Sequence, residues 1–100
     1  MTVLIEQQLP GATAEVVLEI GAQAGVESDP PAGLIVHVVC AAPDGMRVID
    51  VWRSEQDWQQ FQQTRLGPAS GAVLARYGVS GPPPPPYIVS TVAQLNVANS

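Results

Sequence analysis

The stretch that decides the fold runs from Met46 to Pro68 and reads MRVIDVWRSEQDWQQFQQTRLGP. Its first part, residues 46–53, is rich in β-branched residues and predicts a strand. Ser54 follows at once, and Asp57 comes three residues later. This is the spacing of a side-chain cap at a helix N-terminus, so the stretch predicts a strand that leads directly into a helix.

The helix that begins after Ser54 has an apolar stripe made by Trp58, Phe61 and Leu66. Its solvated side is expected to carry four glutamines, Gln59, Gln60, Gln62 and Gln63. We expect Gly67-Pro68 to interrupt this helix and to start a second one over residues 69–77. Gly78 is a suitable residue for its C-terminal cap.

The segment before Met46 is the most β-like part of the chain. Residues 33–42 contain the run LIVHVVC, which is apolar on both faces, so both sides of this strand are expected to be covered. Ala42-Pro43-Asp44-Gly45 supplies a turn, which predicts a hairpin with residues 46–53. Upstream, residues 2–8 predict a strand and residues 14–24 a helix, with Thr13 as its N-cap and Gly25 as its stop.

The end of the chain contains five consecutive prolines, Pro82 to Pro86, followed by an alternating run from Tyr87 to Val97. The prolines predict a stiff polyproline II crossover, with a ligand for a proline-binding module as the alternative. The alternating run predicts a final strand. The order is therefore β-α-β-β-α-β over a single domain, 1–100: an α+β, ferredoxin-like fold with a four-stranded antiparallel sheet and helices on one face.

Composition restricts the partners of this domain. Apolar residues make up 46% of the chain and charged residues only 13%, which leaves apolar surface to cover and favours a homodimer. The net charge is −5 and the four cations are all arginines, so no basic stripe is available for nucleic acid or for an anionic membrane surface. No apolar run is long enough to span a membrane, and the N-terminus does not resemble a signal peptide, so we expect a cytoplasmic protein.

Residues 47–54, with Trp58, Phe61 and the Arg65–Pro68 step, resemble the strand-to-helix signature of the dimeric α/β-barrel proteins. These are the relatives of the antibiotic-biosynthesis monooxygenases, and they include actinobacterial members. The resemblance implies that two four-stranded sheets meet face to face in a homodimer, with the helices on the outside. Haem-degrading members use a histidine in the second helical region, and residues 54–77 contain none.

His37 is the only histidine, and Asp50 on the neighbouring strand is its candidate partner. A four-residue turn over Ala42 to Gly45 places His37 opposite Asp50. A three-residue turn with a glycine bulge instead pairs His37 with Val51 and puts the two polar residues on opposite faces. The Pro-Asp-Gly sequence favours the bulged form. No cluster of histidine and cysteine is available for a metal, and no cofactor is expected.

Trp52, Trp58 and Phe61 are candidates for an aromatic ligand pocket between sheet and helix, with core packing as the simpler interpretation. His37 and Asp50 complete this candidate ligand-binding set, and Arg47 and Arg53 flank the strand. Two functions follow. The first is a homodimeric protein that binds a small molecule, for which an aromatic compound is the candidate, without catalysis. The alternative, implied by the resemblance, is a cofactor-independent monooxygenase of an aromatic or polycyclic substrate, with His37 as the catalytic base.

Overall fold

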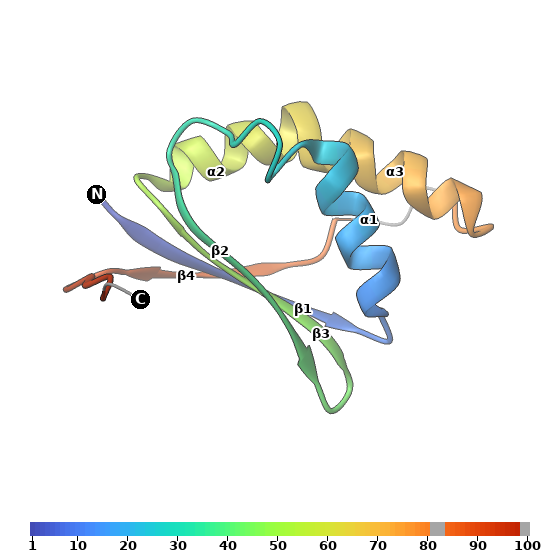
Figure 1. The fold of residues 1–100 in the computed structure, drawn as a ribbon, viewed down its shortest axis with the longest axis horizontal. Coiled ribbons are helices and arrows are strands. Elements are labelled where there is room, and N and C mark those ends of the chain that lie inside the picture. Colours follow the sequence, from blue (N-terminus) through green and yellow to red (C-terminus); the bar gives the residue numbers. More distant parts are fainter. Residues whose placement is uncertain (81–83, 99–100) are drawn as a thin grey trace.

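The computed structural model describes residues 1–80 and 84–98. Four strands form one antiparallel sheet in the order β2-β3-β1-β4, and every helix lies on the same face of it (Figure 1). This confirms the predicted β-α-β-β-α-β order and the ferredoxin-like fold. In chain order the elements are β1 (Val3–Pro10), α1 (Ala14–Ala24), β2 (Leu34–Ala42), β3 (Gly45–Trp52), α2 (Glu55–Phe61), the π-helical η1 (Gln62–Leu66), α3 (Gly67–Arg76) and β4 (Tyr87–Thr91). None of the helices in the described ranges is long and apolar enough to cross a membrane.

The predicted helix caps are confirmed. The Thr13 hydroxyl accepts the Val16 N–H at 3.3 Å at the start of α1. Gly25 ends that helix with a φ of 77°, a conformation that glycine adopts without steric cost. At the start of α2 the Ser54 hydroxyl accepts the Asp57 N–H at 3.1 Å, so the strand of the 46–68 stretch does lead directly into a helix.

The hairpin between β2 and β3 differs from the favoured prediction. Ala42 pairs with Gly45 and His37 pairs with Asp50, so the bulged turn that would pair His37 with Val51 is wrong. The close approach of the end of β1 explains the tight turn. The Gly11 N–H donates to the Asp44 carbonyl at 2.8 Å, and a Cβ at Gly45 would overlap the backbone of Leu9 and Gly11. The irregularity lies at the other end of β2, between Leu34 and Val36.

The second helical region is continuous from Glu55 to Arg76, so the predicted interruption at Gly67-Pro68 is wrong. Pro68 has no N–H, and in a regular α-helix its ring would collide with the carbonyl four residues earlier. The chain widens into the π-helical turn η1 just before this proline, and the Gly67 N–H donates to the carbonyl of Gln62. The helix therefore continues past Pro68 and ends before Gly78, which has the predicted capping geometry with a φ of 81°.

The C-terminal strand is shorter than predicted. β4 ends at Thr91, which pairs with Val3 at the start of β1. The predicted extension to Val97 is wrong because β1 offers almost no backbone beyond this point for pairing. Pro84 to Pro86 form no helix or strand, whereas Pro82 and Pro83, which belong to the predicted polyproline crossover, lie outside the described residues.

The face of the sheet opposite the helices is uncovered and largely apolar. β2 is an edge strand, and Val38 on it is 42% exposed, so the expectation that both of its sides are covered is not met within one chain. The register sets Val38, Ile49, Glu6 and Ile88 in one row across the four strands, and Ile88 on β4 is 56% exposed. The apolar residues of this helix-free face are Leu4, Val36, Val38, Cys40, Ile49, Val51 and Ile88.

Candidate functional site

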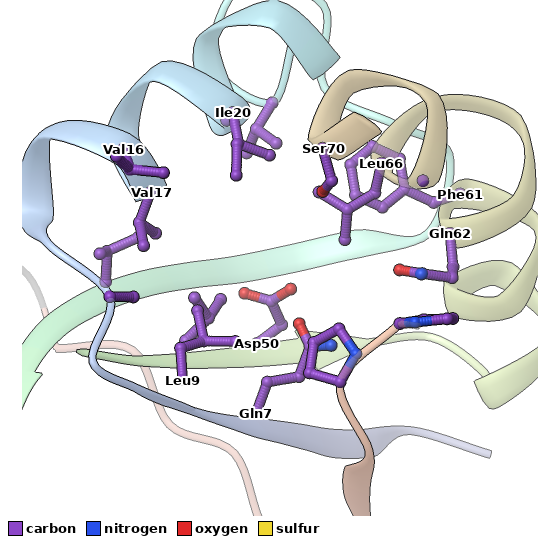
Figure 2. Close-up of a pocket in the computed structure, with 18 of the residues that line it drawn as sticks. Gln7, Leu9, Val16, Val17, Ile20, Asp50, Phe61, Gln62, Leu66 and Ser70 are labelled. Atoms are coloured by element: carbon purple, nitrogen blue, oxygen red, sulfur yellow. The ribbon is translucent and has the colours of Figure 1, made fainter. Parts of the chain in front are cut away.

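A cavity of about 450 Å³ lies between the sheet and the helices. β1, β2 and β3 form its floor, α1 and the second helical region form its walls, and Pro84 and Pro85 lie at its edge. Most of the lining side chains are apolar, as Figure 2 shows for Leu9, Val16, Val17, Ile20, Phe61 and Leu66. A largely apolar hollow with few polar groups is typical of a small-molecule site.

Three side chains are linked by hydrogen bonds in the floor. His37 Nδ1 lies 2.8 Å from Asp50 Oδ1, and the Trp52 indole N–H donates to Asp50 Oδ2 at 3.2 Å. Trp52 is fully buried and Asp50 is 4% exposed, so the carboxylate is buried and has a hydrogen-bond partner for each of its two oxygens. The tight hairpin turn creates this contact, because it places His37 directly opposite Asp50 on the helix side of the sheet.

The contact between His37 and Asp50 has a chemical consequence. When Nδ1 carries the proton that it donates to Asp50, Nε2 carries the free lone pair of the ring. A carboxylate in this position fixes the tautomer and orientation of a histidine that acts as a base. The His37 side chain lines the cavity and is 30% exposed, so a ligand in the cavity can reach it.

The aromatic residues divide into wall and core. Trp58 and Phe61 line the cavity, whereas Trp52 does not; it lies in the core, with its ring centroid 5.9 Å from that of Trp58 and 5.4 Å from that of Phe61. Trp58 also packs edge-on against Tyr87 at 5.6 Å. The same side chains thus belong to the hydrophobic core and form a rigid wall of the cavity.

Three polar lining residues were not among the predicted site residues: Gln7, Gln62 and Ser70 (Figure 2). The prediction that Gln62 lies on the solvated side is wrong, because Gln62 follows Trp58 by four residues and shares its side of the helix. The position of Gln7 could have been predicted from the sequence, because alternation along β1 places it on the same face as Ile5 and Leu9.

The charges around the cavity are sparse. Asp50 is its one acidic lining residue, and no arginine is among the lining residues of the described chain. Arg47 lies on the helix-free face, beside Cys40, and Arg53 is exposed after β3, so neither flanks the cavity. Within residues 1–80 and 84–98 there is no group of three or more metal-ligating side chains.

Comparisons with known proteins give the fold. No family model matches the chain, and no curated protein matches it by sequence. Among solved structures it is similar to SnoaB, a cofactor-independent oxygenase from Streptomyces nogalater, with 15% identity over 94% of both chains and a TM-score of 0.60. A mutant of the same enzyme gives 19% identity over 94% and 93% of the two chains, with a TM-score of 0.56.

A third solved structure, Rv0793 from Mycobacterium tuberculosis, has 16% identity over 98% of both chains and a TM-score of 0.48. At these identities the likeness to SnoaB is one of fold, and it agrees with the architecture built above from the strands, the register and the helix caps. The chain therefore has a ferredoxin-like fold similar to that of SnoaB, with a four-stranded antiparallel sheet and its helices on one face.

Proposed function

We propose that this protein binds a small, uncharged and largely apolar molecule, of aromatic character, in the cavity between sheet and helices. The observation that carries the proposal is the cavity itself: about 450 Å³, apolar in its walls and polar at a few points around Asp50. A ring system of two or three fused rings fits such a volume, and rigid aromatic walls favour it.

Filling the cavity tests the proposal. Gly21 lines it from α1, and a Cβ added there would meet no atom within 4 Å, so a larger side chain would enter the open space. N-phenyl-1-naphthylamine, an uncharged dye that fluoresces in apolar sites, is expected to bind the wild type, and Gly21→Leu is expected to weaken this binding by about tenfold or more. Ala22→Leu, an exposed change on the same helix, is the matched control. Equal binding by both variants would place the dye elsewhere.

We also propose that the protein is a homodimer that buries the helix-free face of the sheet. This face exposes Val38 and Ile88, and Arg47 on it has a buried Nε atom without a partner among the described residues. Both observations are those of a surface that another chain covers. The resemblance to the dimeric α/β-barrel proteins supports a second copy of the same chain as the cover.

Light scattering after size-exclusion chromatography tests the dimer and is expected to give about twice the chain mass of 10.5 kDa. Val38→Lys places a charge among the apolar residues of this face and is expected to shift the mass toward the monomer. Leu18→Lys is the control, because Leu18 is an exposed apolar residue on α1, in the helix layer and away from the helix-free face. A wild-type monomer would contradict the proposal.

A second candidate function is cofactor-independent oxygenation, and the His37–Asp50 contact of 2.8 Å favours it. In such chemistry the substrate reacts with O₂ after it loses a proton, so the protein needs mainly a pocket and a base. His37 Nε2 is the candidate base. SnoaB, which shares the fold, is a cofactor-independent oxygenase, and this supports the candidate.

Oxygen uptake with a panel of hydroquinones and anthrones tests the catalytic candidate. The wild type is expected to consume O₂ with at least one of them in the presence of a metal chelator and without added flavin or haem. Uptake no faster than in buffer across the whole panel would leave the protein as a binding protein without this activity.

A further inference from the structure

Two buried polar atoms in the cavity wall have no hydrogen-bond partner among the described residues. They are the indole nitrogen Nε1 of Trp58 and the amide oxygen Oε1 of Gln62. Trp58 is only 1% exposed. Buried polar groups are almost always paired in folded proteins, because leaving one unpaired costs stability. Two such atoms in one cavity wall therefore point to a partner that the cavity admits.

The two atoms are close in sequence and opposite in chemistry. Trp58 and Gln62 are four residues apart on the same helical segment, so their side chains emerge on the same side of it. The indole N–H can only donate a hydrogen bond, and the amide oxygen can only accept one. Figure 2 shows the Gln62 side chain extending from its helix toward the middle of the cavity, across from Asp50. The wall thus presents one donor and one acceptor.

We infer that Trp58 and Gln62 together recognise a ligand that carries a hydrogen-bond acceptor next to a hydrogen-bond donor. The Trp58 N–H donates to the ligand acceptor, and the Gln62 amide oxygen accepts from the ligand donor. This inference rests on the proposed binding function and narrows it to a class: uncharged ring compounds with a polar edge, such as lactams and hydroxy ketones. Purely apolar rings would leave both protein atoms unpaired, and the site would discriminate against them.

The charges of the cavity favour the uncharged members of this class over the anionic ones. Asp50 is ionisable and lies in the floor, and the lining residues include no arginine to balance a second negative charge. A carboxylate ligand would also present two acceptors to the Gln62 oxygen and no donor. The site is therefore matched to the neutral form of its ligand.

Competition against N-phenyl-1-naphthylamine tests the inference with matched probes. The probes are 2-quinolinone, which has an N–H beside its carbonyl, 1-methyl-2-quinolinone, which lacks the N–H, and naphthalene, which lacks both groups. The wild type is expected to prefer 2-quinolinone over its methyl derivative by about tenfold. Gln62→Leu is expected to abolish this preference, and Gln63→Leu, an exposed change in the same turn, is expected to retain it.

Trp58→Phe tests the donor. It keeps an aromatic ring in the wall and removes the N–H. The affinity for 2-quinolinone is therefore expected to fall by about tenfold, while the affinity for naphthalene is expected to stay the same. A thermal unfolding measurement without ligand separates recognition from a structural role. Gln62→Leu removes a buried acceptor that lacks a partner, so its Tm is expected to rise, whereas loss of a structural contact would lower it.

The outcomes distinguish the two proposals. If neither the dye nor any probe binds, the proposed binding function fails. If the probes bind but the wild type does not prefer 2-quinolinone, or if Gln62→Leu keeps the preference, the binding function stands and the assignment of Gln62 is overturned. If Trp58→Phe loses the same fraction of its affinity for all three probes, the assignment of the indole N–H as the donor is overturned.

Discussion

His37→Ala is expected to lower the rate of oxygen uptake by about 10²- to 10⁴-fold for any substrate that the wild type oxidises, which is the usual contribution of a general base. His37 is the only histidine of the chain, it lines the cavity, and its Nδ1 is held 2.8 Å from Asp50. Binding of N-phenyl-1-naphthylamine should persist in this variant, because the apolar walls are unchanged. The comparison therefore separates the base from the pocket.

Asp50→Asn is the companion variant, because it keeps the shape of the side chain and removes its charge. An amide can still bond His37, but it can present its NH₂ group to the ring and favour the tautomer with the proton on Nε2. That tautomer cannot accept a proton from the ligand side, so a slow rate is expected here too. Equal rates in the wild type and His37→Ala would remove His37 from the mechanism, whatever Asp50→Asn does.

Trp52→Ala is expected to lower the free energy of unfolding by about 3–5 kcal/mol, which is typical of a buried aromatic side chain cut back to a methyl group. Trp52 is fully buried and touches the rings of Trp58 and Phe61, and its N–H donates to the buried Asp50 carboxylate. The free energy of unfolding of a folded domain is about 5–15 kcal/mol in total, so the variant is expected to lose a large share of its stability.

Urea unfolding followed by circular dichroism measures this loss. Trp52→Phe is the control, because it keeps a ring between Trp58 and Phe61 and removes the hydrogen bond to Asp50. It is expected to lose less than Trp52→Ala. A loss below about 1 kcal/mol in Trp52→Ala would mean that the packing around this residue collapses to fill the space, and that Trp52 is not central to the core.

The parts of the fold that the sequence predicts well are those decided by neighbouring residues. The caps at Thr13, Ser54 and Gly25 are read directly, because a cap is a contact between residues three or four apart. The end of β4 at Thr91 is decided by where β1 begins, almost ninety residues earlier in the chain. Such a limit belongs to tertiary pairing, and the alternation from Tyr87 to Val97 carries no sign of it.

The candidate site shows the same division. The prediction picked out His37, Asp50, Trp58 and Phe61 by residue type, and all four line the cavity. Whether His37 meets Asp50 depends on one residue in a turn, and the turn is fixed by the approach of β1 rather than by its own sequence. Gln62 was assigned to solvent together with the other glutamines, although it follows Trp58 by four residues and therefore lies on the same side of the helix. The hairpin register depends on a contact with another strand, whereas the position of Gln62 could be read from the helical period.

The two-residue turn at Pro43 and Asp44 has a consequence for how the protein can diverge. An extra residue that is taken up in the turn leaves Ala42 paired with Gly45 and His37 opposite Asp50, and surface turns commonly accept such insertions. A one-residue slip of β2 along β3 would instead set Ile49 or Val51 opposite His37, a hydrocarbon in place of an acid. The pairing register of two strands therefore controls the acid–base character of the site, and relatives are expected to vary in the length of this turn while they keep the pair.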